Sequence, residues 1–406
     1  MLETLDTVDW GRLTHAAGAA DDVPDLIRML LSDKASVRER AIGEDGLWGV
    51  LCHQDSLYEA TAPAVPFLLE LVRNPQVKDR GKILDLLADF ALGGYDVVET
   101  ETATRSRDLS LPPDTRPGQE RAIEWTRQTR AAVQSGRDIY LQLLDDRIVR
   151  VRQGAIAVLV AACKTDGEAV APILRRRFSR ERNREQRASL VQALAAFTRV
   201  SAETHEFLTA VYEQDTDELA RLCAADVLAK LDGERTRGDI VETLAQAMAH
   251  PDSELAQAYE SLDGDIAAAL RYVGQRGIAS ALRAIAGELA RHCATPIDEL
   301  PLGDTGIITT WREGHNGRRQ RHTLEGQSIY PWPPVLTLTS ALLRFIFVAP
   351  YPMERAAPLT DIQRQALALI LGCDSAWRYD LDVQQELFTY GIPYTRNALR
   401  VYLEQR

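Results

Sequence analysis

The stretch DKASVRERA, residues 33–41, decides the fold prediction for this chain. It sets an acidic turn before Val37 and Arg38, and a small residue, Ala41, three positions after the arginine. The acid, the arginine and the small residue return together at Asp146, Arg152 and Ala155, and again at Asp215, Arg221 and Ala224. Weaker echoes at Arg187 and Gln257 leave steps of 35, 34 and 36 residues from Arg152 onward. A fixed step of this size predicts a stack of helical hairpins.

The spacing of apolar residues inside each step favours helices over strands. Val151, Ala155, Val158, Leu159 and Ala162 follow the three-to-four rhythm of one helix face, whereas a strand would alternate. We expect the acid before each second helix to cap its exposed N–H groups, and the arginine to reach the acid of a neighbouring repeat. The small residues at the alanine position are expected to be buried between repeats.

With these phrases the chain resembles the HEAT repeat proteins, whose second helix opens with Asp, then Val-Arg and Ala at this spacing. Residues 10–13 (WGRL), 52–54 (CHQ) and 59–66 (EATAPAVP) are also similar to a group of uncharacterised bacterial HEAT proteins. The resemblance covers residues 8–293. It implies an armadillo-like α-solenoid that is used mostly for binding.

The predicted fold is therefore all-α, an α-α superhelix of about seven repeats in residues 1–293. The helix pairs are expected near residues 22–52, 58–93, 119–163, 165–198, 202–231, 237–261 and 264–293. The rhythm breaks at residues 94–118, where prolines and polar residues without periodicity predict a long inserted loop.

Residues 294–406 are predicted to cap the last hydrophobic face of the stack. Two β-prone runs around Asn316-Gly317 predict a β-hairpin near residues 306–324. The proline-rich segment 330–334 is expected to be a stiff connector. Beyond it, helices are predicted at residues 336–348, after a capping box at residues 360–363, and before a stop at residues 390–393.

Composition narrows the cellular setting. With 47 Lys and Arg against 59 Asp and Glu, the net charge of −12 disfavours a nucleic-acid or membrane-surface partner and favours a basic one. The five cysteines stand singly, so we expect buried thiols rather than a disulfide or zinc framework. No signal peptide or membrane-spanning run is found, and the predicted location is the cytoplasm.

No set of residues predicts catalysis, a metal or a cofactor. HEAT-like metal hydroxylases need several His-Glu dipeptides, and His205-Glu206 is the one dipeptide of this kind. The sequence shows no glycine-rich phosphate-binding motif, and no Ser or Cys stands at a spacing that predicts a nucleophile with a His-acid pair. The protein is therefore expected to be non-enzymatic, with no catalytic or metal-ligating residue.

Trp48, His53 and Tyr58 form the first candidate for partner binding. They cluster at the end of a predicted second helix, and second helices of HEAT hairpins line the concave surface. The alternative is structural: His53 and its neighbour end the helix by satisfying its carbonyls, while Trp48 lies in the core.

Two arginine-rich segments give further candidates. Residues 175–187 contain seven arginines and predict either a solvated turn or a patch for an acidic partner. The second segment is residues 312–321, where Arg312, Arg318 and Arg319 are expected on the predicted hairpin. Trp332 follows the hairpin in the sequence and is expected beside these arginines. These arginines suit recognition of phosphate or carboxylate, or else they dock the cap onto the acidic repeats.

The leading hypothesis is a HEAT scaffold that holds a protein or peptide, preferably a basic one, on its concave face. A narrower hypothesis is an immunity protein that neutralises a nuclease toxin by masking its cationic surface. The enzyme alternative is a HEAT-like DNA glycosylase or a bilin-lyase-like protein. A glycosylase requires a basic groove for an extruded base, which the net charge disfavours.

Overall fold

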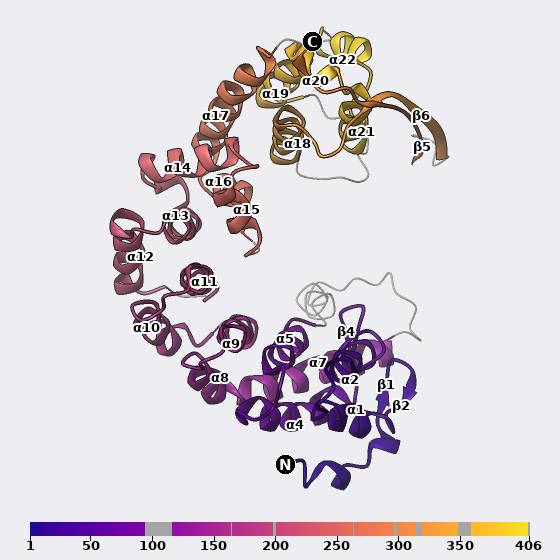
Figure 1. The fold of residues 1–406 in the computed structure, drawn as a ribbon, viewed down its shortest axis with the longest axis vertical. Helices are drawn as coiled ribbons and strands as arrows, with labels where there is room; N and C mark the ends of the chain where they lie inside the picture. Colours follow the sequence, from indigo (N-terminus) through magenta and orange to yellow (C-terminus); the bar gives the residue numbers. More distant parts are fainter. Residues whose placement is uncertain are drawn as a thin grey trace. The chain divides into compact units, whose positions relative to one another are not determined.

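A computed structural model describes residues 1–93, 116–163, 165–197, 200–262, 264–295, 299–313, 319–347 and 359–404. The chain divides into two compact units, residues 1–207 and residues 208–406. Helices dominate both units, and the strands form two-stranded hairpins (Figure 1). The predicted all-α class with a small β-hairpin is confirmed. The predicted boundary at residue 293 falls inside the second unit.

The first unit consists of helix pairs and two very short hairpins. Its 3-10 helices are Leu5–Thr7 and Trp10–Arg12. Its strands are β1 (Thr14–His15), β2 (Gly18–Ala19), β3 (Cys52–His53) and β4 (Ser56–Leu57). Its helices are α1 (Val23–Met29), α2 (Ala35–Ile42), α3 (Leu47–Leu51), α4 (Thr61–Arg73), α5 (Arg80–Leu92), α7 (Arg116–Ser135), α8 (Arg137–Leu143), α9 (Val149–Ala162), α10 (Gly167–Phe178) and α11 (Arg184–Ala195). Helix α12 (Ala202–Gln214) runs across the boundary into the second unit.

Second helices of successive pairs pack on one another in this unit. Helix α2 contacts α5, α5 contacts α9, and α9 contacts α11. Figure 1 shows α5, α9 and α11 following one another. Ala41 and Ala155 are fully buried, as expected for the small position of the repeated phrase. The α5–α9 contact is close, because a Cβ on Gly154 would lie 2.7 Å from the Cβ of Leu84. Small residues therefore set the distance between neighbouring pairs.

Buried arginines connect each second helix to the next pair. Each guanidinium donates to a carbonyl near the end of its own first helix and to a carboxylate at the turn before the next second helix. We call these three contacts the arginine ladder: Arg38 Nε to Asp79 Oδ2 at 2.8 Å, Arg80 Nη2 to Asp146 Oδ2 at 2.8 Å, and Arg152 Nε to Glu181 Oε2 at 2.9 Å. The predicted reach of the repeat arginine to an acid of the next repeat is confirmed at Arg38 and Arg152, and Arg80 makes the same contact without having been predicted.

Two sequence predictions need correction in this unit. Residues 22–293 were expected to contain no strand, yet β3 and β4 pair as a hairpin, with Cys52 opposite Leu57. The loop assigned to residues 94–118 is shorter at its end, because α7 begins at Arg116. Residues 94–115 lie outside the described part of the chain. Helix α7 packs on α4 and α5, and the predicted pair at residues 119–163 contains three helices, α7, α8 and α9.

The second unit continues with helix pairs and then a different C-terminal part. Its helices are α13 (Glu218–Asp232), α14 (Gly238–Ala249), α15 (Glu254–Glu260), α16 (Ile266–Tyr272), α17 (Gln275–Cys293), α18 (Pro334–Ile346), α19 (Asp361–Gly372), α20 (Asp374–Trp377), α21 (Asp380–Thr389) and α22 (Arg396–Glu404). A 3-10 turn spans Gly233–Arg235, and the strands are β5 (Asp304–Glu313) and β6 (Arg319–Ser328).

Ten of the fifteen residues of helix α13 are buried, and the helix contacts α14, α15 and α16. Its Ala224 is fully buried, as the repeated phrase predicts. Asp226 is also buried, and it accepts a hydrogen bond from Lys230 one turn later at 2.9 Å. The arginine position of the next repeat is Gln257, whose amide donates to the Asp252 carbonyl at 3.3 Å. The arginine ladder therefore does not extend to this repeat.

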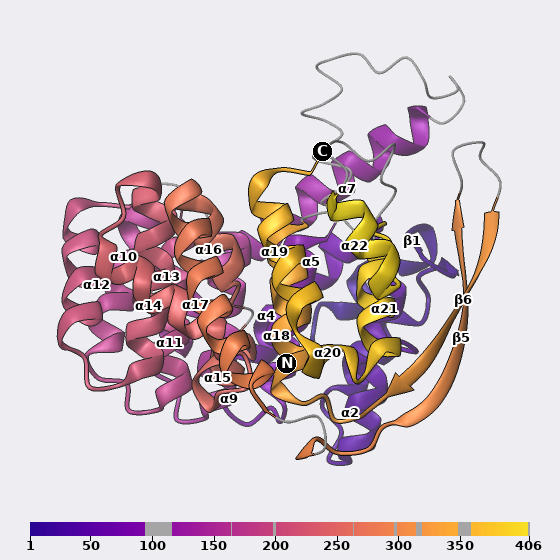
Figure 2. The same cartoon turned by 90° about the horizontal axis from the view of Figure 1, so that it is seen from above.

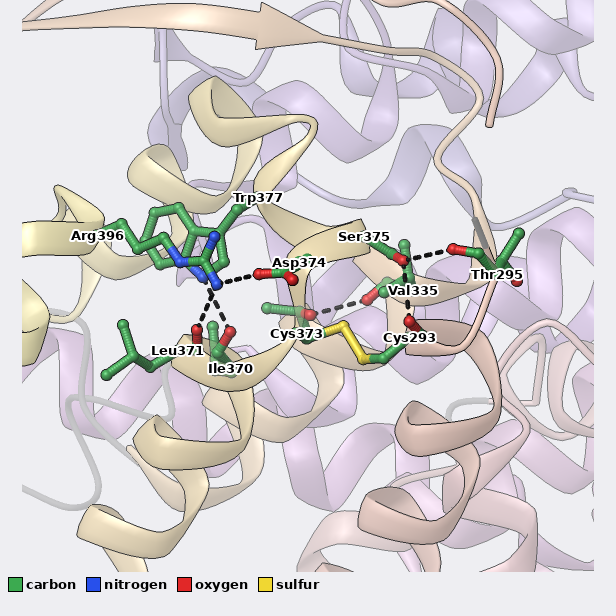
Figure 3. Close-up of a disulfide and its surroundings, with 11 residues drawn as sticks. Cys293, Thr295, Val335, Ile370, Leu371, Cys373, Asp374, Ser375, Trp377 and Arg396 are labelled. Carbon is green, nitrogen blue, oxygen red and sulfur yellow. Dashed lines mark hydrogen bonds and ion pairs between the residues drawn. A yellow bond between two sulfur atoms is a disulfide. The ribbon is translucent and has the colours of Figure 1, made fainter. Parts of the chain in front are cut away.

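A disulfide joins Cys293 at the end of α17 to Cys373 between α19 and α20 (Figure 3). The Ser375 hydroxyl donates to the carbonyl of Cys293, and the Trp377 indole donates to the Ile370 carbonyl at 2.9 Å. The expectation of five free thiols is wrong for this pair, whereas the other three cysteines are buried and free. The partners are 80 residues apart, so no local spacing could reveal them.

The predicted C-terminal hairpin is confirmed, with β5 and β6 pairing antiparallel from Asp304 opposite Ser328 to Glu313 opposite Arg319. Its predicted Asn-Gly turn lies outside the described residues. Strand β6 packs along α21, as Figure 2 shows. Ile308 and Leu324 of the hairpin contact Leu381 and Phe388 of that helix. The predicted capping box at Thr360 is also present, with Gln363 as its second member.

Candidate functional site

The predicted cluster of Trp48, His53 and Tyr58 surrounds the β3–β4 hairpin. His53 is exposed at the edge of the turn, and Tyr58 is half-buried directly after β4. The turn residues Gln54 and Asp55 both have positive φ, at 49° and 61°, which is the backbone of a tight type I′ turn. His53 therefore continues a strand instead of ending a helix, and the interpretation as a helix-terminating residue is wrong.

Trp48 connects α3 to α5 at this place. Its half-buried indole hydrogen-bonds the carboxylate of Asp89. Burial, with Asp85 nearby, raises the pKa of Asp89 even though the bond from Trp48 lowers it. The adjacent Cys52 is buried, and burial raises the pKa of its thiol to about 12, so this cysteine is a protonated thiol near neutral pH. These contacts give Trp48 a structural role.

The second predicted group is divided by the structure. In the hairpin register, Arg312 lies opposite Gln320, and Arg319 lies opposite Glu313. Arg318 lies outside the described residues. Trp332 is half-buried and hydrogen-bonds the carboxylate of Asp382 in α21. Trp332 thus connects the segment after β6 to α21 within the cap, and both alternatives for the arginines remain predictions.

Three of the seven arginines of residues 175–187, Arg175, Arg177 and Arg187, are half-buried, and the other four are exposed. Arg177 donates to the Leu144 carbonyl at 2.6 Å and to Glu181 at 2.7 Å. Arg187 lies over the ring of Phe178, with its guanidinium carbon 4.0 Å from the ring centre. These contacts give Arg177 and Arg187 a structural role, and an anion-binding role for the exposed arginines remains a prediction.

A groove in the second unit brings together residues that the sequence analysis did not single out. It has a volume of about 680 Å³ and lies between the end of α12, the start of α13, the length of α14 and the start of α15. Apolar surface comes from Tyr212, Leu222, Ala247 and Leu255. Polar groups come from Glu218, Arg221, Asp239, Glu242, Thr243, Gln246, His250 and Ser253.

Carboxylates dominate the charge of this groove. Glu218, Asp239 and Glu242 are exposed at its rim, the Arg221 guanidinium also lines it, and Arg237 pairs with both carboxylate oxygens of Asp239. Arg221 donates through Nε to the Tyr212 carbonyl at 3.0 Å, which holds it at the α12–α13 turn. A hydrogen bond from Arg237 lowers the pKa of Asp239, so that carboxylate is ionised at neutral pH. The groove therefore presents an apolar floor and an acidic rim.

Hydrogen bonds fix the floor and one end of the groove. The Tyr212 and Thr243 hydroxyls are 3.0 Å apart and link α12 to α14. His250 lies at the other end, with Nδ1 2.8 Å from the Gln246 carbonyl and Nε2 3.4 Å from Glu288. The walls are therefore set by the folded helices and exist before any ligand binds.

The sequence did contain a signal for this groove. Asp239, Glu242, Thr243, Gln246 and His250 recur at helical spacing and form one polar stripe along α14. A polar stripe is usually a solvated helix face, and the spacing cannot reveal that the ends of α12, α13 and α15 surround it. The tertiary packing of four helices produces the site.

Comparison with known proteins assigns no family. No protein-family model matches the chain, and no curated protein matches it. Within the described residues, no helix combines the length and apolar character needed to cross a bilayer. The same residues include no group of three or more His, Cys, Asp or Glu side chains placed to hold a metal ion. The cytoplasmic location stays a prediction, and the disulfide is unusual for that compartment.

Proposed function

We propose that this chain is a HEAT-like binding protein whose α12–α15 groove takes a basic peptide segment of a partner protein. The observation that carries this proposal is the combination of an apolar floor with the rim carboxylates Glu218 and Glu242, beside Asp239, which Arg237 pairs with. Lysine and arginine side chains have the complementary composition, because their aliphatic stems pack on apolar surface while their charged heads remain at a polar edge.

The size of the groove supports a peptide as ligand. A volume of about 680 Å³ is in the range of sites that enclose a drug-sized molecule or several side chains. The carboxylates stand on two different helices, Glu218 on α13 and Glu242 on α14. Two cationic side chains of one extended segment could be bound at the same time, which gives specificity for their spacing.

The predicted concave-face sites have less support. Trp48 and Trp332 each bind a carboxylate within the fold, and binding roles for His53, Tyr58, Arg312, Arg318 and Arg319 remain predictions. The proposal therefore keeps the expected class of partner, a protein or peptide of basic character, and moves the contact to the groove.

Fluorescence anisotropy with labelled ten-residue peptides tests the proposal. Alternating Lys-Leu is the basic probe, and alternating Glu-Leu is its acidic counterpart. The basic peptide should bind, and Glu218→Gln with Glu242→Gln should weaken binding at least about ten-fold, because two ion pairs at a partly desolvated rim are lost.

The matched control is Glu254→Gln, which removes an exposed carboxylate of α15 outside the groove lining. It makes the net charge less negative by the same step as each test substitution and should leave the affinity unchanged. Equal binding of both peptides, or equal weakening by Glu254→Gln, would show that only the overall charge attracts the probe and would refute the proposed site.

A further inference from the structure

The β5–β6 hairpin has one covered edge and one open edge. Helix α21 covers the outer edge of β6, where Asp380 accepts from the Gln327 N–H at 2.8 Å and Asp382 accepts from the Ile329 N–H at 3.1 Å. Gln384 donates to the Glu325 carbonyl on the same edge at 2.9 Å. Side chains of α21 thus take the place of a third strand beside β6.

These bonds also fix which groups of β5 are free. Because the Gln327 N–H goes to Asp380, the pair of Thr305 and Gln327 is not hydrogen-bonded within the hairpin. The register from Asp304 to Glu313 is continuous, so alternate pairs share this property, including Thr309 with Thr323. The N–H and C=O groups of Thr305, Ile307 and Thr309 therefore point away from β6, and no other described residue bonds them.

The open edge lacks the features that usually block strand addition. Strand β5 contains no lysine and no proline, and ten residues are long for an edge strand. Ile307 is 68% exposed, and Leu302 and Tyr330, at the base of the hairpin, are 86% and 92% exposed. Exposed apolar side chains beside unpaired backbone groups are the properties of a strand-pairing surface.

We propose that the open edge of β5 pairs antiparallel with β5 of a second copy of this chain, and that the two hairpins form one four-stranded sheet. The two-fold axis passes through Ile308. In this register Ile307 lies opposite Thr309 of the second copy, which places the outward N–H and C=O groups of both residues in one hydrogen-bonded pair. This surface is separate from the α12–α15 groove.

The charges of β5 select a second copy as the occupant. With the axis at Ile308, Asp304 lies opposite Arg312 of the second copy, and the same pair forms again by symmetry. An axis at Ile307 would set Asp304 opposite uncharged Thr310, and an axis at Thr309 would set it beyond the end of the strand. Residues 304–328 hold four arginines against three acids, so two hairpins meet with little repulsion despite the net charge of −12.

Sedimentation velocity of the full chain tests the proposal, with proline variants at one cross-strand pair. Thr309 and Thr323 are directly opposite, both are exposed, and their N–H groups point to opposite edges. Thr309→Pro removes a donor from the open edge without removing a bond between β5 and β6. Thr323→Pro does the same on the β6 side and is the matched control.

The wild-type protein should be a dimer at micromolar concentration. Thr309→Pro should weaken dimerisation at least about ten-fold, and Ile307→Lys should weaken it as well, whereas Thr323→Pro should leave the dimer intact. Equal melting temperatures of the variants confirm that the hairpin stays folded. A monomeric wild-type protein at 100 micromolar (about a hundred times the expected range), or a dimer that survives Thr309→Pro, would overturn the proposal; the first result would leave the edge to a strand of another partner.

Discussion

The two units use the same repeated phrase but are held together by different interactions. In the first unit, the arginine ladder joins successive helix pairs through buried ion pairs, and Arg80 is only 3% exposed. In the second unit, Arg221 donates to the Tyr212 carbonyl, Gln257 stands at the next arginine position, and a disulfide and the Asp226–Lys230 pair are further polar links. Ala224 in the second unit is as buried as Ala41 in the first. The close packing at the small residue therefore does not depend on the arginine ladder.

This difference indicates what the phrase itself supplies. The small residue sets the close approach of neighbouring helices in both units, and apolar packing supplies most of the stability. The arginine adds a link only where the following turn provides a carboxylate, as Asp146 does for Arg80. Removing an ion pair of the arginine ladder should therefore destabilise the first unit alone, and removing the disulfide should destabilise the second unit alone.

The largest effect is expected for Asp146→Ala. It leaves the buried guanidinium of Arg80 without its carboxylate, which should lower the free energy of unfolding by about 3–5 kcal/mol. Hydrogen exchange of backbone amides, measured by mass spectrometry, should show faster exchange in residues 1–93 and no change in the second unit.

A matched control exists in the same unit. Asp33 also binds a cation at 2.8 Å, but both Asp33 and its partner Lys78 are exposed. Asp33→Ala should therefore change stability by less than about 1 kcal/mol. If the two alanine variants lose the same stability, burial of the ladder does not matter and the comparison between the units fails.

The second prediction concerns the disulfide. Replacing both partners by alanine, Cys293→Ala with Cys373→Ala, should destabilise the second unit by about 2–4 kcal/mol, because the bond closes a long loop of the unfolded chain. Urea unfolding of the two proteins gives this difference. Titration of thiols in denaturant provides the independent check, since the bonded protein should contain three reactive thiols and the fully reduced protein five.

The third prediction tests the small position. Ala155→Phe should overpack the contact between α9 and its neighbours and lower the free energy of unfolding by about 1–3 kcal/mol. Ala157→Phe adds the same side chain at an exposed position of the same helix. Thermal melts should separate the two variants; an unchanged melting temperature for Ala155→Phe would contradict its place in the contact.

The smallest effect is a difference in pH dependence. Burial raises the pKa of Asp226 despite the Lys230 cation, so the ionised form destabilises the folded state, and this cost is relieved as the pH falls toward the ordinary value of 3.8. Burial also acts on Glu181, but the Asn183 N–H and Arg152 outweigh it and lower the pKa. The stability from Glu181 is therefore lost as the pH falls below its ordinary value of 4.5.

Urea unfolding between pH 6 and pH 4 can measure both signs (this range spans the ordinary values of Asp and Glu within about 2 units). Relative to Asp226→Asn, the wild-type protein should gain stability as the pH falls. Relative to Glu181→Gln, it should lose stability at the acid end of the range. If both stability differences change in the same direction as the pH falls, folding does not shift the pKa values of Asp226 and Glu181 in opposite directions.

Much of the fold could be predicted because its determinants are local and repeated. The phrase at Arg38 and Arg152, the apolar rhythm after Val151 and the capping box at Thr360 each lie within a few residues of one another. The disulfide and the unit boundary could not be predicted, because they depend on which distant helices meet. Strand β3 was missed because two residues are too few for an alternating pattern.

The candidate site could be predicted only in its chemical character. An acidic protein with a preference for a basic partner follows from the net charge, and the groove carboxylates agree with it. Its location depends on Tyr212 and Leu255, which are far apart in sequence and contribute little signal alone. Aromatic and arginine residues are good candidates for interfaces in general, yet Trp48 and Arg177 are engaged in the fold.

The arginine ladder also gives the first unit a direction. Every rung takes its cation from the earlier helix pair and its carboxylate from the later one; Arg80 precedes Asp146 by 66 residues. During synthesis on the ribosome each guanidinium therefore emerges before its partner and stays hydrated until the next pair arrives. Truncation from the C-terminal side strands a buried cation, whereas truncation from the N-terminal side frees a carboxylate such as Asp79, which is already 31% exposed to water. Shortening this unit is thus easier from its beginning than from its end.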